Sequence, residues 1–169
     1  MQQAKDTMIA WLRDAHAMEQ ATVDNQERLV SHLEHYPEIR SRFEQHMQES
    51  RMRADKLERH LKDLGADTST FKEMTTKFAS MAQQTITGGS SDEIVKQVVA
   101  AAAFEEFELA NFKALATAAE LNNEPAIKAT CDEAVRDQEE MVSWLSQQIP
   151  PITREYLLRN EQGRGDAKH

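Results

Sequence analysis

Glycine and proline are scarce in this chain, which has five of the first and four of the second in 169 residues. Strand-like runs that alternate Val, Ile, Thr and aromatic residues with polar ones are absent. The common residues are instead Ala, Glu, Gln, Leu, Met, Lys and Arg, all of which favour helices. We therefore predict an all-α fold, and the length suffices for one domain with a sizeable core.

Cysteine and long apolar runs are nearly absent as well. The single cysteine, Cys131, cannot form a disulfide within the chain, which indicates a reducing compartment. No stretch approaches the ~20 consecutive apolar residues that cross a bilayer. The first residues also lack the apolar core and cleavage site of a signal peptide. We predict a cytoplasmic protein that has no membrane partner.

The charge excludes further classes. The formal net charge is −9, and acidic and basic residues are interleaved along the chain. Such a balance argues against binding of nucleic acid phosphates. No Ser/His/Asp or Cys/His arrangement stands out, so we predict no hydrolase, name no catalytic residue and identify no small-molecule substrate.

Apolar periodicity predicts four long helices, at about 6–35, 37–64, 90–122 and from 125 to Pro150. Pro37 suits the start of the second helix and Gly65 its end. Pro150-Pro151 is expected to end the fourth helix, before a short tail helix. We predict a single domain over residues 1–160 and a disordered tail over 161–169.

The lengths of the links predict the topology. The first and second helices, and the third and fourth, are joined by short links and should form antiparallel hairpins. The link 66–91 is long, and Thr70 with Glu73 indicates a short extra helix within it. This connectivity, with one long crossover, is that of a ferritin-like four-helix bundle.

Four glutamates fall on the predicted inward faces: Glu19, Glu49, Glu105 and Glu108. Counted from the turn near Tyr36, Glu19 and Glu49 differ in height by roughly 6 Å at about 1.5 Å per residue. Carboxylates buried in one layer repel one another, so they need protons, basic partners or a metal. Ferritin-like di-metal sites use such a layer, and we predict two iron or manganese ions bridged by these four residues.

The fourth helix departs from that site pattern. It has Gln138 and Met141 where Glu-x-x-His is expected. His46, Asp137 and Gln138 are further candidate ligands. His16, His32, His35 and His60 are expected on helix surfaces, and Cys131 in the core.

Arg53 also faces inward in this pattern and could neutralise one or two of the glutamates without a metal. Three hypotheses therefore stay open. The layer holds a metal pair or a single metal. It is a metal-free polar network closed by Arg53, Gln138 and water. Or the register of a helix differs, and some of these residues face solvent.

Five segments carry a resemblance to a known family: WLRDAHAMEQ, YPEIRSRFEQHMQES, SSDEIVK, FEEFELANF and WLSQQIP. In them the chain resembles the YciE/YciF family of bacterial ferritin-like proteins, and more closely the YciE branch. The resemblance implies a four-helix bundle, usually a dimer, linked to stress responses, with a di-metal site at the four glutamates. The family pattern differs at Arg53, Phe112 and Asp137-Gln138, where glutamine, tyrosine and two adjacent acids are common.

These observations predict a homodimeric, ferritin-like stress-response protein with an iron or manganese site. The rival hypothesis is a metal-free structural or interaction protein that keeps the fold with a degenerate site. An iron store of the ferritin type would need a cage of many subunits, which a small oligomer would exclude.

Overall fold

The computed structural model describes residues 2–66, 78, 80 and 93–161. Within these ranges it contains four helices: α1 (Gln2–Val30), α2 (Pro37–Asp63), α4 (Glu93–Leu121) and α5 (Pro125–Glu161). No strand occurs in them, so the all-α prediction is confirmed. The expected short helix after Thr70 and the expected tail beyond Glu161 lie outside the described residues. None of the described helices is long and apolar enough to cross a membrane.

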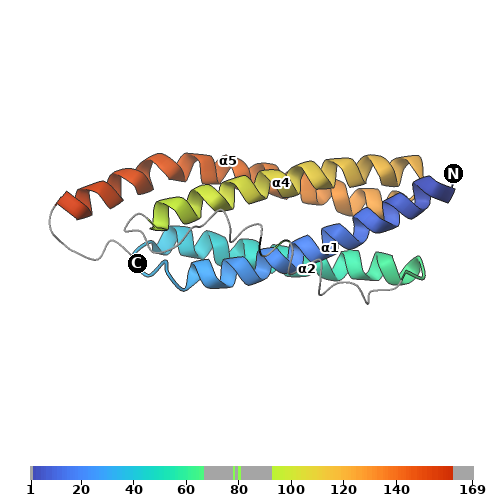
Figure 1. Cartoon of the computed structure of the whole chain (residues 1–169), viewed down its shortest axis with the longest axis horizontal. Helices are drawn as coiled ribbons and strands as arrows, with labels where there is room; N and C mark the ends of the chain where they lie inside the picture. Colours follow the sequence, from blue (N-terminus) through green and yellow to red (C-terminus); the bar gives the residue numbers. More distant parts are fainter. Residues whose placement is uncertain (1, 67–77, 79, 81–92, 162–169) are drawn as a thin grey trace.

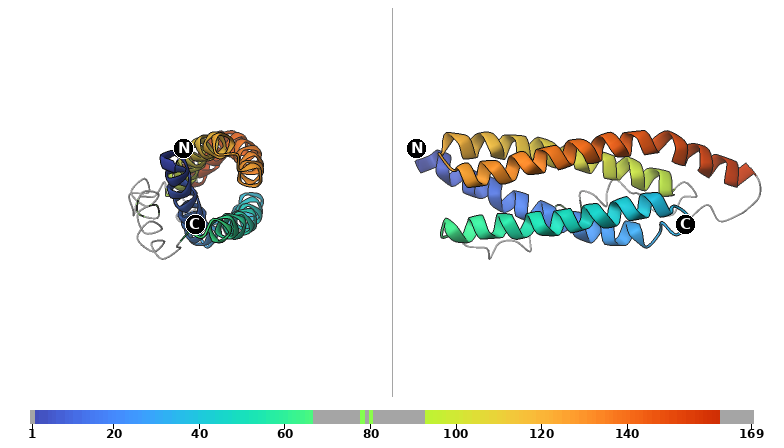
Figure 2. Two further views of the ribbon diagram at one scale, coloured as in Figure 1. Left: turned by 90° about the vertical axis from the view of Figure 1, so that its right-hand side faces the viewer. Right: turned by 180° about the vertical axis from the view of Figure 1, so that it is seen from behind.

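The helices form two antiparallel hairpins, α1 with α2 and α4 with α5 (Figure 1). The hairpins meet through α1 against α4 and α2 against α5, which closes a ring seen end-on in Figure 2. Helices α2 and α4 run in the same direction (Figure 1), as the predicted connectivity with one crossover between the hairpins requires. They lie diagonally across the ring, with no close backbone approach between their described residues. The predicted connectivity is confirmed.

Helices α2 and α4 end with the same type of C-cap, in which one residue adopts the left-handed conformation. Gly65 has a φ of 65°, and the next amide, of Ala66, donates to Leu61 O at 2.9 Å. At the end of α4, Asn123 has a φ of 55°, and the amide of Glu124 donates to Ala119 O at 2.9 Å. Gly and Asn are the residues that tolerate this left-handed conformation. The predicted glycine cap is confirmed, and the cap at Asn123 lies in the turn that joins α4 to α5.

Helix α1 ends at Val30, about one turn earlier than the predicted end near His35. The chain then passes through tight turns, in which the amide of Tyr36 donates to Leu33 O at 3.1 Å. Both of these side chains are buried. In these turns Leu33 and Tyr36 pack in one cluster with Ile152 and Tyr156, near the end of α5.

The prediction that Pro150-Pro151 ends the fourth helix is wrong, because α5 continues to Glu161. Each proline removes one helical N–H donor. Packing offsets that loss: Ile152 and Tyr156 lie beyond the prolines and are buried in one cluster with Tyr36. The guanidinium of Arg159 lies 5.1 Å from the centre of the Tyr36 ring.

The core consists of two apolar clusters, one toward each end of the bundle. One includes Leu12, Leu57, Phe112, Ile127 and Cys131, and the other includes Leu33, Phe43, Ile94, Met141 and Leu145. Burial raises the pKa of the Cys131 thiol to about 12, which fits the predicted core residue. His16 was expected on the surface and is buried, because α1 packs against both α2 and α4 and so covers a wide stripe.

Candidate metal site

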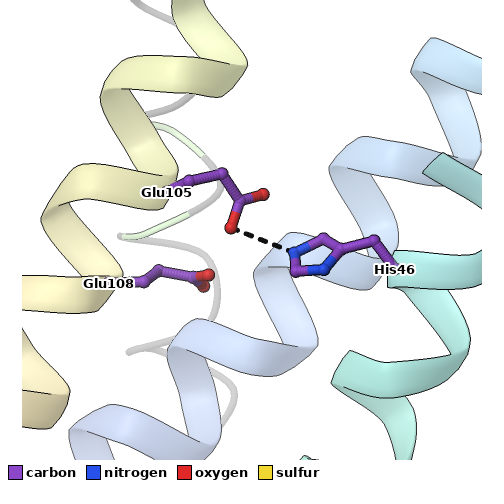
Figure 3. Close-up of side chains that lie close together, drawn as sticks. All are labelled: His46, Glu105 and Glu108. Carbon is purple, nitrogen blue, oxygen red and sulfur yellow. Dashed lines mark hydrogen bonds and ion pairs between the residues drawn. The ribbon is translucent and has the colours of Figure 1, made fainter. Parts of the chain in front are cut away.

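A layer of buried polar side chains separates the two apolar clusters. All four described helices contribute to it, with Glu19, Thr22, Gln26, His46, Ser50, Arg53, Glu105, Glu108 and Gln138. The inward stripes predicted from spacing bring these residues together at mid-bundle, so the hypothesis of a different register is wrong for them. Figure 3 shows Glu105 and Glu108 pointing from α4 toward His46 on α2.

Glu105 lies at the centre of this layer and is fully enclosed. Its Oε1 accepts a hydrogen bond from Gln26 Nε2 at 3.1 Å, and its Oε2 lies 3.0 Å from His46 Nε2. Burial favours its neutral form, but the charge and hydrogen bond of His46 outweigh burial and lower the pKa of Glu105. The pair with His46 bridges the two diagonal helices across the bundle centre.

Glu108 follows one helical turn later and has no exposed surface. Burial, followed by the charges of Glu19 and Glu105, raises its pKa well above the usual range. Its oxygens contact the Gln138 amide and the Thr22 hydroxyl. That hydroxyl also has the Met18 carbonyl at 3.1 Å, yet it carries only one hydrogen. A protonated Glu108 resolves this conflict, because it can donate to Thr22 while Thr22 donates to the carbonyl.

His46 has a carboxylate at each ring nitrogen. Its Nδ1 lies 3.2 Å from Glu49 Oε2, and its Nε2 faces Glu105. Burial by itself would lower the pKa of His46, but the two carboxylates raise it to about 9. Without a metal the imidazole is therefore a cation at neutral pH and donates from both nitrogens.

Glu49 lies at the rim of the layer, with 23% of its side chain exposed. It also accepts a hydrogen bond from Gln45 at 2.8 Å and lies 3.4 Å from Arg42 Nη1. The hydrogen bond from His46 is the main reason that the pKa of Glu49 falls to about 2. In this position Glu49 orients the imidazole, as carboxylates commonly do for metal-binding histidines.

Glu19 and Arg53 form the other half of the layer. Arg53 Nε lies 3.2 Å from Glu19 Oε1, and both side chains are buried. Neither oxygen of Glu19 accepts a hydrogen bond of ordinary geometry from the described part of the chain. Burial raises the pKa of Glu19, and the charge of Arg53 opposes that rise. The inward position predicted for Arg53 is confirmed.

Three of the candidate ligands come together. His46, Glu105 and Glu108 each offer one ligand atom, and these atoms lie within 4.8 Å of one another. Nitrogen and oxygen ligands bind a divalent ion at about 2.0–2.2 Å, so the three atoms would have to draw together to share one ion. Two other candidates are not part of this group: Gln138 contacts Glu108 through its amide N–H rather than its oxygen, and the side chain of Asp137 is 38% exposed.

Sequence reasoning did not assign a role to Thr22 or Gln26. Both follow Glu19 on the same stripe of α1, and each contacts a carboxylate of α4. The sequence feature that could have identified them is a polar side chain at a position where the helical periodicity predicts an apolar one.

Comparison with known proteins finds a matching family and solved structures of similar fold. Residues 3–158 match the model of a family described as a domain of unknown function, DUF892. A protein of known structure from Xanthomonas campestris pv. campestris is 29% identical, with a TM-score of 0.80 over 94% of this chain and 99% of that one. The Escherichia coli stress protein YciF is 16% identical, with a TM-score of 0.74 over 88% of this chain and 96% of that one. The second likeness shows a shared fold, and the ferritin-like bundle expected from the sequence is confirmed.

Proposed function

The chain belongs to the DUF892 family, and we propose that it is a ferritin-like protein that binds iron or manganese in the core of its bundle. The observation that carries this proposal is the group of His46, Glu105 and Glu108. Its three ligand atoms come from two separate hairpins, and all three side chains are buried. Imidazole and carboxylate are a ligand set that suits such borderline and hard cations.

The surrounding residues support the same function. Glu49 holds the outer nitrogen of the His46 ring, which leaves Nε2 directed at the two glutamates. Gln138 Oε1 is buried and has no hydrogen-bond donor among the described residues. Buried acceptors of this kind are costly unless a proton, water or cation satisfies them. A bound iron or manganese ion would supply redox chemistry, while these residues would hold and orient it.

Elemental analysis tests the proposal. The protein is purified without chelator and measured again after anaerobic incubation with ferrous iron or Mn²⁺. We expect bound metal in the unchanged protein and its loss in Glu108→Ala. The matched control is Glu106→Ala, since Glu106 lies on the same helix but is exposed and should retain the metal. Metal at background level in the unchanged protein, with intact helicity by circular dichroism, would overturn the proposal.

The rival function, a metal-free structural or interaction protein, rests on one specific observation. With Glu108 protonated, the positive charges of His46 and Arg53 balance the negative charges of Glu19 and Glu105. The layer is then electrically neutral without a metal. The elemental analysis separates the two functions, because the rival predicts no bound metal in the unchanged protein or in either of its variants.

Three further parts of the proposal concern the setting of the molecule. The E. coli protein of similar fold is a stress protein, and we propose a stress-related role for this chain, within the YciE branch. We also propose that it works in the cytoplasm as a homodimer. Light scattering coupled to gel filtration should give twice the mass of the chain, and a mass of many subunits would point to a storage cage instead.

A further inference from the structure

We propose that Arg53 takes the place of a second metal ion, so that each chain holds one divalent cation rather than two. This inference rests on the proposed metal-binding function. It concerns the number of ions, for which the spacing of the glutamates predicts two. The residues present fit one ion and do not fit a second.

The position of Arg53 is the first argument. It extends from α2 into the polar layer and is 4% exposed. Its guanidinium pairs with Glu19 of α1 at 3.2 Å, lies 5.7 Å from the ring centre of Phe112 of α4, and reaches Asp137 of α5 at 4.0 Å. A cation that has neighbours on the other three helices occupies the centre of the bundle.

The division of the glutamates is the second argument. Glu105 and Glu108 face His46, and these three form the group that could hold an ion. Glu19 is the carboxylate that would have to serve a second ion, and it is paired with Arg53 instead. Arginine stays protonated under all conditions in which the protein is folded, so it cannot make room by losing its charge.

The charge of the layer is the third argument. Three carboxylates are completely enclosed: Glu19, Glu105 and Glu108. If all three are ionised, Arg53 and one divalent ion together neutralise them, with His46 as a neutral ligand. A second divalent ion would leave two positive charges without partners in the core, which is strongly unfavourable. Glu49 does not alter this balance, because it is already paired with Arg42 at the rim.

The test is a count of ions in metal-free protein titrated with Mn²⁺. Bound metal per chain is measured by elemental analysis after gel filtration. We expect one ion in the unchanged protein and two in Arg53→Met, where Glu19 becomes available. Arg53→Lys keeps the charge and should stay at one. The matched control is Arg51→Met, since Arg51 lies on the same helix, is 40% exposed and pairs with Glu27; it should also stay at one.

The outcomes separate this inference from the function on which it rests. No ion in the unchanged protein overturns the proposed function. Two ions in it overturn the role of Arg53 while metal binding stands. One ion in Arg53→Met, with unchanged helicity, likewise overturns it. If Arg53→Met does not fold, electron paramagnetic resonance of the unchanged protein saturated with Mn²⁺ decides: isolated ions support the inference, and an exchange-coupled pair overturns it.

Discussion

His46 connects the chemistry of the site to its energetics. His46 lies at hydrogen-bond distance from Glu49 of its own helix, α2, and from Glu105 of α4. A buried imidazole without such partners would be neutral. Here Glu49 and Glu105 hold it as a cation, and in the proposed function a metal would take the place of its proton on Nε2. The same contacts that bind the proton therefore prepare the ligand.

The charge of His46 should make the stability of the metal-free protein depend on pH. Its pKa is about 9 in the folded state against 6.5 for a free side chain. Its contribution is therefore fully present below pH 6.5 and is lost as the pH rises through 9. The loss should be at most about 3 kcal/mol. We expect urea unfolding with chelator present to show lower stability at pH 9 than at pH 6.

His46→Gln supplies the control for this pH dependence. It keeps a polar side chain but cannot gain a proton, so the fall between pH 6 and pH 9 should become smaller. Burial and the neighbouring glutamates also raise the pKa of Glu108. Because its pKa is higher in the folded state, the ionisation of Glu108 also lowers stability as the pH rises. Some slope should therefore remain in the variant. An equal slope in both proteins would mean that His46 is not charged in the folded state.

At the scale of the element, α5 depends on contacts that lie far from it in the sequence. Tyr156 is buried four residues after Ile152, against the turn that follows α1. Truncation of a buried aromatic side chain typically costs about 3–5 kcal/mol. We expect Tyr156→Ala to lower the free energy of unfolding by an amount of this order and to melt the part of α5 beyond the prolines.

Leu157→Ala is the matched control, because Leu157 is the next residue and is 54% exposed. It should change the free energy of unfolding by no more than about 0.5 kcal/mol. Hydrogen exchange of the amides after Pro151 gives a direct measurement of the helix. Unchanged protection there in Tyr156→Ala would show that the helix does not depend on this packing.

Features that depend on contacts within one helix could be predicted from the sequence, whereas features that depend on distant contacts could not. The inward position of Glu105 and Glu108 follows from spacing within α4, and the cap at Gly65 follows from the sequence at the end of α2. Both predictions are confirmed. The continuation of α5 depends on Tyr36, more than a hundred residues away, and local proline rules cannot foresee it. The contact of His46 with Glu105 depends on how α2 is rotated about its axis relative to α4. Side-chain packing sets that rotation, and no spacing within either helix contains it.

At the scale of the whole molecule, the site is a link between the two hairpins. Helix α2 belongs to the first hairpin and α4 to the second, and their backbones do not approach each other closely in the described ranges. In the metal-free protein the pair of His46 with Glu105 joins these two helices directly in the layer. An ion held by His46, Glu105 and Glu108 would replace that single bridge with bonds to both hairpins.

A ligand that binds only the folded chain raises its stability according to its concentration relative to its dissociation constant. At a hundredfold excess over that constant, Mn²⁺ should raise the free energy of unfolding by about 2.7 kcal/mol. The urea midpoint should rise on addition of Mn²⁺ and return with chelator. Glu106→Ala should show the same rise, whereas Glu108→Ala should show none. If Mn²⁺ binds to the folded protein but leaves the midpoint unchanged, the unfolded chain binds it equally well, and the ion does not hold the hairpins together.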